Sequence, residues 1–286
     1  MTDSTAEALA RFSSAWQPKE LKDGQTQQVA LRRARADIPE LGDLLDKAVT
    51  AAHSALAVII GNFPIDDAAL TIAAGAFGTV DASCNGPNPD TLVHNVVDSE
   101  ARPYRDPDPF HTDSPLLPRS HAYLGLLCVQ PSPNGDGQTI LMRAVDIAAE
   151  LARRSRLGPL RDPCYPFAVP QAPGSEGPVP IANPIITMSE GDVTVRYCPV
   201  RVAAGVRLAG HELDSEHLTA LRTFERTLRR PDLAAVFMLH AGDLLLLDNR
   251  RLLHGRTDVH PDGAGRHLKR VKVHASDWPL AGRLIS

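Results

Sequence analysis

Short apolar runs that alternate with turn-forming residues dominate the second half of this chain, and they constrain its fold more than any other feature. Runs at 122–130, 138–144 and 267–274 have the length of buried strands, and Gly, Pro, Asn and Asp cluster between them. Helical spacing of apolar residues occurs before and between these runs, with one helix beginning at Pro39 and another capped by Asp214. The pattern predicts an α+β chain whose strands build a β-sandwich or barrel core.

The 286 residues show neither an internal repeat nor a break in composition that would mark a second domain. Residues 1–25 are polar and lack a sustained period, so we expect a loosely held arm with at most a short helix. Residues 26–286 are then expected to form a single domain. The long loops at 78–109 and 157–180, rich in Gly and Pro, are candidates for a lid over a functional site.

The charge balance excludes whole classes of partner. Thirty Lys and Arg against 34 Asp and Glu give a net charge of −4, whereas a nucleic-acid binder needs a basic surface. No apolar run approaches the roughly 18 residues of a membrane helix, and no signal pattern begins the chain. The four cysteines are far apart, without a C-x-x-C pair, which favours buried thiols in a reducing compartment. We therefore expect a cytoplasmic protein that binds no nucleic acid and no membrane.

The sharpest chemical signal is a pair of potential metal ligands, His111 and Asp113. In an extended segment their side chains leave the same face and can meet one ion, although such a pair arises easily among eleven histidines and 34 acids. His254 follows the apolar run 244–247 and a polar turn, which would place an imidazole at the mouth of a barrel. Two histidines and one carboxylate with open positions are the pattern of mononuclear non-haem Fe(II) oxygenases.

A short basic strand after His254 strengthens this interpretation. In an extended strand Arg266, Leu268 and Arg270 share one face, so two guanidinium groups can point into the same cavity. Burying an arginine is costly unless an anion pairs with it. A dicarboxylate bound beside the metal would supply that anion.

With these residues the sequence resembles the Fe(II)- and 2-oxoglutarate-dependent oxygenases of the taurine dioxygenase and clavaminate synthase-like family. Four motifs carry the resemblance, in the order in which the family has them: Phe110–Asp113, Gly135–Thr139, Gly242–Arg256 and Arg266–Arg270. The resemblance implies a double-stranded β-helix, or jelly roll, with flanking helices. It also implies Fe(II), 2-oxoglutarate and O2 as cofactor and co-substrates.

The same resemblance assigns roles to individual residues. It makes His111, Asp113 and His254 the iron ligands. It gives the distal carboxylate of 2-oxoglutarate to Thr139 and Arg266, and it places Arg270 against either the co-substrate or the substrate. Halogenases of this superfamily replace the carboxylate ligand with Ala or Gly, so Asp113 indicates oxygenation.

Two positions are candidate substrate contacts. Family members that act on free basic amino acids often carry acids after the strand that matches 193–197, whereas Arg196–Arg201 contains none. We therefore expect a substrate whose distal end is not cationic, with Arg201 facing an anionic or polar group, although Arg201 could simply lie at the surface. Asn95, together with its neighbour His94, lies where family members often contact substrate, but both could instead bond their own loop.

The expected function is oxidation, most simply hydroxylation, of an unactivated C–H bond in a small molecule such as an amino acid or natural-product intermediate, with release of succinate and CO2. The same chemistry could instead give desaturation, cyclisation or epimerisation. A jelly-roll sensor that binds the metal without turnover is an alternative of another class. A zinc hydrolase with the same ligands would have no use for Arg266 and Thr139. The sequence carries no prediction of oligomeric state.

Overall fold

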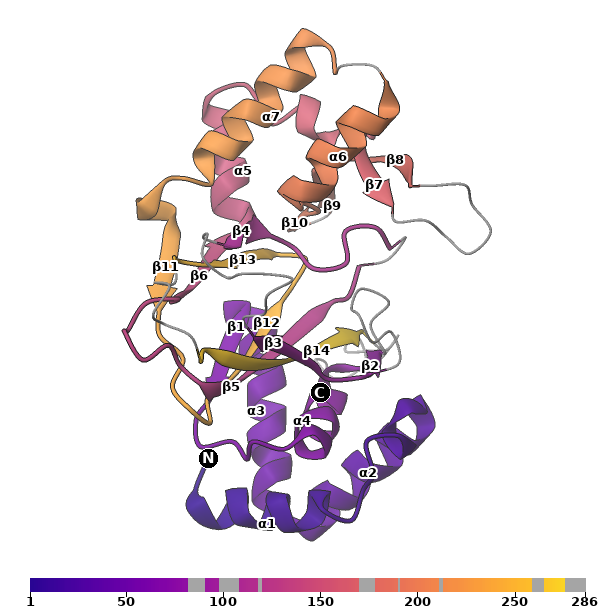
Figure 1. Cartoon of the computed structure of the whole chain (residues 1–286), viewed down its shortest axis with the longest axis vertical. Helices are drawn as coiled ribbons and strands as arrows, with labels where there is room; N and C mark the ends of the chain where they lie inside the picture. The colour runs from indigo at the N-terminus through magenta and orange to yellow at the C-terminus, as the bar shows by residue number, and fades with distance from the viewer. Residues whose placement is uncertain are drawn as a thin grey trace.

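Two antiparallel sheets face each other in the middle of the molecule, with helices on their outer sides (Figure 1). The computed structural model describes residues 1–81, 91–97, 108–117, 120–169, 178–189, 191–210, 213–258 and 265–275. Within these residues no helix is both long and apolar enough to cross a membrane. The chain is thus an α+β structure, as its pattern of apolar runs predicts.

The larger sheet has six strands in the order β1-β12-β5-β14-β2, with β3 also pairing with β14. Its strands are β1 (Ala57–Ile60), β2 (Thr79–Asp81), β3 (His94–Val97), β5 (Tyr123–Gln130), β12 (Leu244–Asp248) and β14 (His267–His274). The long strand β14 pairs with β5 along one edge and with β3 and then β2 along the other. Strand β14 is therefore a central strand of this sheet, with hydrogen-bonded neighbours on both sides.

The smaller sheet has four strands in the order β11-β6-β13-β4. These strands are β4 (Asp108–His111), β6 (Thr139–Arg143), β11 (Ala234–Phe237) and β13 (Leu252–Arg256). Two further hairpins lie beside it, formed by β7 (Tyr165–Val169) with β8 (Val179–Asn183) and by β9 (Ile186–Ser189) with β10 (Asp192–Val195).

Helices cover the outer face of each sheet (Figure 1). On the side of the larger sheet lie α1 (Asp3–Ser13), α2 (Gly24–Asp37), α3 (Pro39–Ala55) and α4 (Asp67–Ala74). On the side of the smaller sheet lie α5 (Ala144–Arg153), α7 (Ser215–Thr227), which packs on α5, and α6 (Pro199–Ala209), which packs on β7 and β8. The caps follow the sequence signals: Pro39 opens α3, and the Asp66 and Asp214 carboxylates accept the N–H groups of Ala69 and His217.

The two-residue period of the strands divides the core into three layers. On β12, Leu244 and Leu246 pack against the helices below, whereas Leu245 and Leu247 pack between the sheets. On β14, Leu268 points between the sheets and Val271 points to the helices. By the same alternation Arg266, Arg270, Lys272 and His274 face the space between the sheets, so the most polar face of β14 points into the molecule.

The N-terminal segment differs from expectation. Residues 3–13 form the helix α1, and its Leu9 is fully buried in the same core as α3 and α4. The terminal amine also donates a hydrogen bond to the Gly61 carbonyl at 2.8 Å. A loosely held arm is therefore not what the structure contains: one buried leucine with Phe12 and Trp16 packed against the same core is enough to dock a short helix.

The two loops expected to act as lids are only partly described. Residues 82–90, 98–107 and 170–177 lie outside the described residues, and so does Cys84. The described part of the second loop is not irregular, because it contains β7 and the start of β8. The other three cysteines, Cys128, Cys164 and Cys198, have no disulfide partner among the described residues.

Candidate metal centre

Strand pairing brings two histidines and an aspartate together from distant parts of the chain. His111 ends β4 and lies directly opposite His254 on β13, with 4.4 Å between their ring centroids. Asp113 follows two residues after His111, and its Oδ1 lies 3.6 Å from His111 Nε2. One potential ligand atom from each of the three lies within 4.8 Å of the other two. This spacing suits donors that share one metal ion.

The turn that carries Asp113 is fixed by buried hydrogen bonds. The fully buried side chain of Asn249, in the turn between β12 and β13, accepts the Asp113 N–H at 2.7 Å. Its amide nitrogen donates to the carbonyls of Asp113 and His121, both at 3.0 Å. Ser114 has a φ of 57°, an uncommon conformation for a residue with a side chain. The backbone therefore turns shortly after the end of β4, and this turn keeps the Asp113 side chain next to the two histidines.

Two cations hold the Asp113 carboxylate in its ionised form. Asp113 is 6% exposed; its Oδ2 lies 3.2 Å from Arg270 Nη1 and 3.6 Å from Lys272 Nζ. Burial alone would raise the pKa of Asp113, but Arg270 and Lys272 together hold this pKa well below its ordinary value. The carboxylate is therefore an anionic oxygen donor at physiological pH.

His254 is held in the opposite state, as a neutral base. Burial, and then the nearby His111, lower the pKa of His254 to about 3. Its Nδ1 is buried without a hydrogen-bond partner. Neutral imidazole is the form that binds metals, and a buried polar atom without a partner is costly unless something else binds there. Two imidazoles and one ionised carboxylate fit an Fe(II) ion, which accepts this donor set with positions left open.

Thr139 and Arg256 form a polar pair across β6 and β13, two residues along β13 from His254. Thr139 on β6 is 2% exposed and is paired with Arg256 of β13, itself 4% exposed. Arg266 lies just before β14, and its Nε donates to the Gly137 carbonyl at 3.1 Å. Arg256 lies two residues from His254, which is about 6.8 Å along a strand. That is close to the length of a five-carbon dicarboxylate.

The two candidate substrate residues are placed differently. Arg201 lies in the first turn of α6, just after Tyr197, whose backbone N–H donates to Thr112 Oγ1 at 3.1 Å. Thr112 separates His111 from Asp113, so the start of α6 is held close to the metal centre. Asn95 is not brought to the centre, because it is exposed and its amide oxygen is 2.8 Å from His267 Nε2.

His94, the neighbour of Asn95 and the other candidate from the sequence, is opposite Arg270, and its pKa is lowered by burial and then by Arg270 and Lys272. The structure also adds two residues that the motifs did not single out. Lys272 and Arg256 are both buried on the inner face of their strands. Their signal in the sequence is the two-residue period itself, since Lys272 continues the series 266, 268, 270 and Arg256 follows His254.

Comparison with known proteins identifies the class to which this fold and centre belong. The sequence profile described as "Taurine catabolism dioxygenase TauD, TfdA family" matches residues 20–272. The chain belongs to the TauD/TfdA family, whose members are non-haem Fe(II)- and 2-oxoglutarate-dependent dioxygenases. No curated protein matches the chain.

Solved structures share the fold over nearly the whole chain. An asparagine oxygenase in complex with Fe(II), 2S,3S-3-hydroxyasparagine and succinate has a TM-score of 0.77 at 20% identity, covering 96% of this chain and 92% of its own. The non-haem iron oxygenase OrfP with Fe and α-ketoglutaric acid has a TM-score of 0.70 at 18% identity, covering 96% and 93%. OrfP with Fe and L-Arg gives 0.70 at 19%, with the same coverage. At these identities the likeness concerns the fold.

Proposed function

We propose that this protein is an Fe(II)- and 2-oxoglutarate-dependent oxygenase that hydroxylates an unactivated C–H bond of a small molecule, with release of succinate and CO2. The observation that carries the proposal is the convergence of His111, Asp113 and His254. Arg270 contacts the Asp113 carboxylate, and Thr139 is opposite Arg256, two residues along β13 from His254. The facing sheets are, in this proposal, the two halves of a double-stranded β-helix, and residues 26–286 with the docked α1 form one domain.

His111, Asp113 and His254 are the proposed iron ligands. When bound, the iron supplies the capacity to activate O2 and to attack an unactivated C–H bond. The chain holds the donors in the protonation states that the metal needs: His254 as a neutral base and Asp113 as an anion. Asn249 acts as a positioning residue, because its three hydrogen bonds fix the backbone on either side of the Asp113 turn. The presence of Asp113 also favours oxygenation over halogenation.

Thr139 and Arg266 are the proposed contacts of the distal carboxylate of 2-oxoglutarate. The Arg266 guanidinium is oriented by its hydrogen bond to Gly137, and the buried Arg256 lies beside Thr139. Arg266 is half-buried and Arg256 is buried, and a carboxylate accepts charge-assisted hydrogen bonds from guanidinium groups in such surroundings. Arg270 already contacts Asp113, so it would orient the part of the co-substrate or substrate that lies next to the iron ligands.

The substrate is proposed to be a small amino acid or a related natural-product intermediate with a neutral or anionic distal end. The related structures contain hydroxyasparagine in one case and L-Arg in another. The segment Arg196–Arg201 has no acid to receive a guanidinium, and Arg196 is itself occupied by the carbonyls of Pro115 and Leu117. The position of Arg201 at the start of α6 supports a role in binding an anionic or polar group.

A turnover screen tests this proposal. Iron-loaded protein is supplied with 2-oxoglutarate, O2 and neutral, acidic or basic amino acids, and succinate is measured together with the mass of the product. We expect succinate above the uncoupled background with a neutral or acidic substrate, and a product that gains one oxygen atom. Loss of two hydrogens would indicate desaturation or cyclisation, whereas an unchanged mass with succinate release would indicate epimerisation. No substrate-stimulated succinate over a broad panel would favour the sensor alternative.

The substrate contact is tested by Arg201→Ala, with the exposed Arg207→Ala on the same helix as the control. We expect Arg201→Ala to raise the KM for substrate about tenfold or more while the KM for 2-oxoglutarate stays the same. Unchanged kinetics in Arg201→Ala would remove Arg201 from the site.

A further inference from the structure

A second group of two histidines and one aspartate lies at the edge of the larger sheet. Asp81 ends β2, His274 ends β14 and His121 lies two residues before β5. The pairing of β2 with β14 sets His274 opposite Thr79, and the Ala122 N–H donates to the Val273 carbonyl at 2.9 Å. Strand pairing and this hydrogen bond therefore fix the backbone around all three positions.

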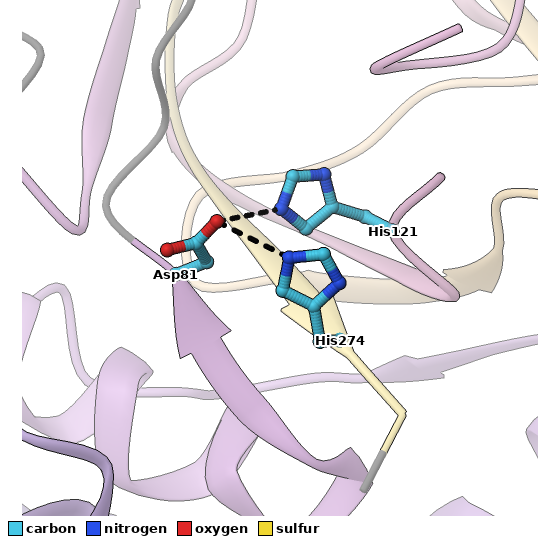
Figure 2. Close-up of side chains that lie close together, drawn as sticks. All are labelled: Asp81, His121 and His274. Atoms are coloured by element: carbon cyan, nitrogen blue, oxygen red, sulfur yellow. Dashed lines mark hydrogen bonds and ion pairs between the residues drawn. The ribbon is translucent and has the colours of Figure 1, made fainter. Parts of the chain in front are cut away.

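The three side chains converge on a single carboxylate oxygen. Figure 2 shows both imidazole rings directed at Asp81, and the distances from Asp81 Oδ2 to His121 Nε2 and to His274 Nε2 are both 3.2 Å. The two rings are stacked with 4.2 Å between their centroids. The three donor atoms lie within 4.8 Å of one another.

These distances match donors that share one small cation. Ligand atoms about 2.0–2.1 Å from a tetrahedral Zn²⁺ lie about 3.3 Å from each other. Two imidazole nitrogens and a carboxylate oxygen are ligands that Zn²⁺ and its first-row neighbours prefer.

One of the two rings also has the support that metal-binding histidines usually have. His121 is 1% exposed, and its other ring nitrogen, Nδ1, lies 2.7 Å from Ser114 Oγ. A hydrogen bond at the distal nitrogen fixes the orientation and tautomer of a histidine ligand. The Asn249 amide also holds the His121 carbonyl at 3.0 Å. His121 is thus fixed with Nε2 directed at Asp81.

We propose that Asp81, His121 and His274 bind one divalent transition-metal ion of the Zn²⁺ class at a second site. The side chains of Asp81 and His274 are 37% and 39% exposed, so an ion can enter from solvent and a water can complete the coordination. The ion would join the ends of β2 and β14 to the turn that carries Ser114 and Asp113. Its role is therefore structural, and the inference does not depend on the proposed oxygenase function.

The test uses the full-length protein with the first centre disabled by His111→Ala and His254→Ala. After removal of metal by a chelator, Zn²⁺ or Co²⁺ is added alone, and bound metal is counted after dialysis. We expect one ion per chain, a Co²⁺ visible spectrum of low-coordinate character, and a rise in the thermal midpoint with Zn²⁺. The unaltered protein should bind two ions under the same conditions.

Partly exposed ligands provide variants that should still fold. In the same background, Asp81→Asn and His274→Gln should each weaken Zn²⁺ binding at least about 100-fold, whereas His267→Gln, at the other end of β14, should not. Thermal melting without metal verifies that each variant is folded. The proposal would be overturned if the protein with the disabled first centre bound no ion, or if Asp81→Asn and His274→Gln left binding unchanged. Asp81, His121 and His274 would then be a hydrogen-bonded cluster without a metal.

Discussion

The molecule contains the same three ligand types twice, in surroundings that differ greatly. At the first centre, His254 and Asp113 are 6% exposed, and Arg270 and Lys272 both lie within 4 Å of the carboxylate. At the second, two of the three side chains are more than a third exposed, and the third is bound to Ser114. Two histidines and an aspartate can therefore define a metal site in either place. Arg270 and Lys272, which lie beside the Asp113 carboxylate, and the buried Thr139 make the first centre the one that we propose for an anionic co-substrate.

The largest expected effect separates the two clusters by their chemistry. His254→Ala removes a proposed iron ligand, so succinate formation should fall more than about 100-fold, and metal content should fall by one ion per chain. His267→Gln is the matched control and should retain activity, because the ring of this β14 histidine bonds to the Asn95 amide oxygen, away from the centre. Comparable turnover in His254→Ala would contradict the assignment of the first centre.

The next effect concerns the co-substrate and has no counterpart at the second cluster. Arg266→Ala should raise the KM for 2-oxoglutarate about 100-fold, as expected for the loss of about 3 kcal/mol from a charge-assisted pair. Thr139→Val should raise it about tenfold, because one hydrogen bond from an uncharged donor to the carboxylate is lost. Metal binding at both clusters should stay the same in both variants. The exposed Arg250→Ala serves as the control, and an unchanged KM in Arg266→Ala would place the distal carboxylate elsewhere.

The Lys272 ammonium affects both clusters electrostatically, because it lies 3.6 Å from Asp113 Oδ2 and contributes to lowering the pKa of His121. It compensates the buried Asp113 carboxylate when no metal is present, but it also repels any cation that binds. Lys272→Met should therefore lower the stability of the metal-free protein by about 1–3 kcal/mol, the usual cost of leaving a buried polar group less compensated. It should also increase the thermal shift produced by metal. Lys269→Met, which removes the ion pair to Asp67 on the opposite face of β14, is the control, and its metal-induced shift should equal that of the unaltered protein.

The smallest expected effect comes from a carboxylate outside both clusters. Hydrogen bonds from Arg153 and Arg154 lower the pKa of Glu150 to about 2. Because the folded pKa lies below the ordinary value, the stabilising contribution is complete above about pH 4.5 and is lost as the pH falls toward 2. Glu150→Gln should therefore lower the thermal midpoint at pH 7, and the difference should disappear in acid. The exposed Glu216→Gln is the control, and a difference independent of pH would contradict the ion-pair explanation.

Much of the fold follows from the sequence because the strands and helices have clear local signals. The apolar runs at 122–130 and 267–274 became β5 and β14, and Pro39 and Asp214 mark the starts of α3 and α7. The inward face of β14 also follows, since alternation alone puts Arg266 and Arg270 on one side. Helix α6 was not expected, although Pro199 at its start and Gly210 just after its end are ordinary boundary signals.

What the sequence does not determine is the pairing of strands that are far apart along the chain. The sequence names Asn95 and His94 together, and only the register of β3 against β14 shows that His94 is half-buried opposite Arg270 whereas Asn95 is exposed. The second cluster depends on the register of β2 against β14, and nothing near Asp81 indicates that His274 will lie beside it. Both features come from tertiary contacts that leave no local pattern.

The central claim is that His111, Asp113 and His254 hold an Fe(II) ion to which 2-oxoglutarate binds. Anaerobic addition of Fe(II) and 2-oxoglutarate to the metal-free protein tests this directly, because chelation of the metal by the keto acid gives a visible charge-transfer absorption. We predict that the absorption appears in the unaltered protein and in Asp81→Asn, and that it is absent in His254→Ala. A band that survives His254→Ala, or no band in the unaltered protein, would contradict the account.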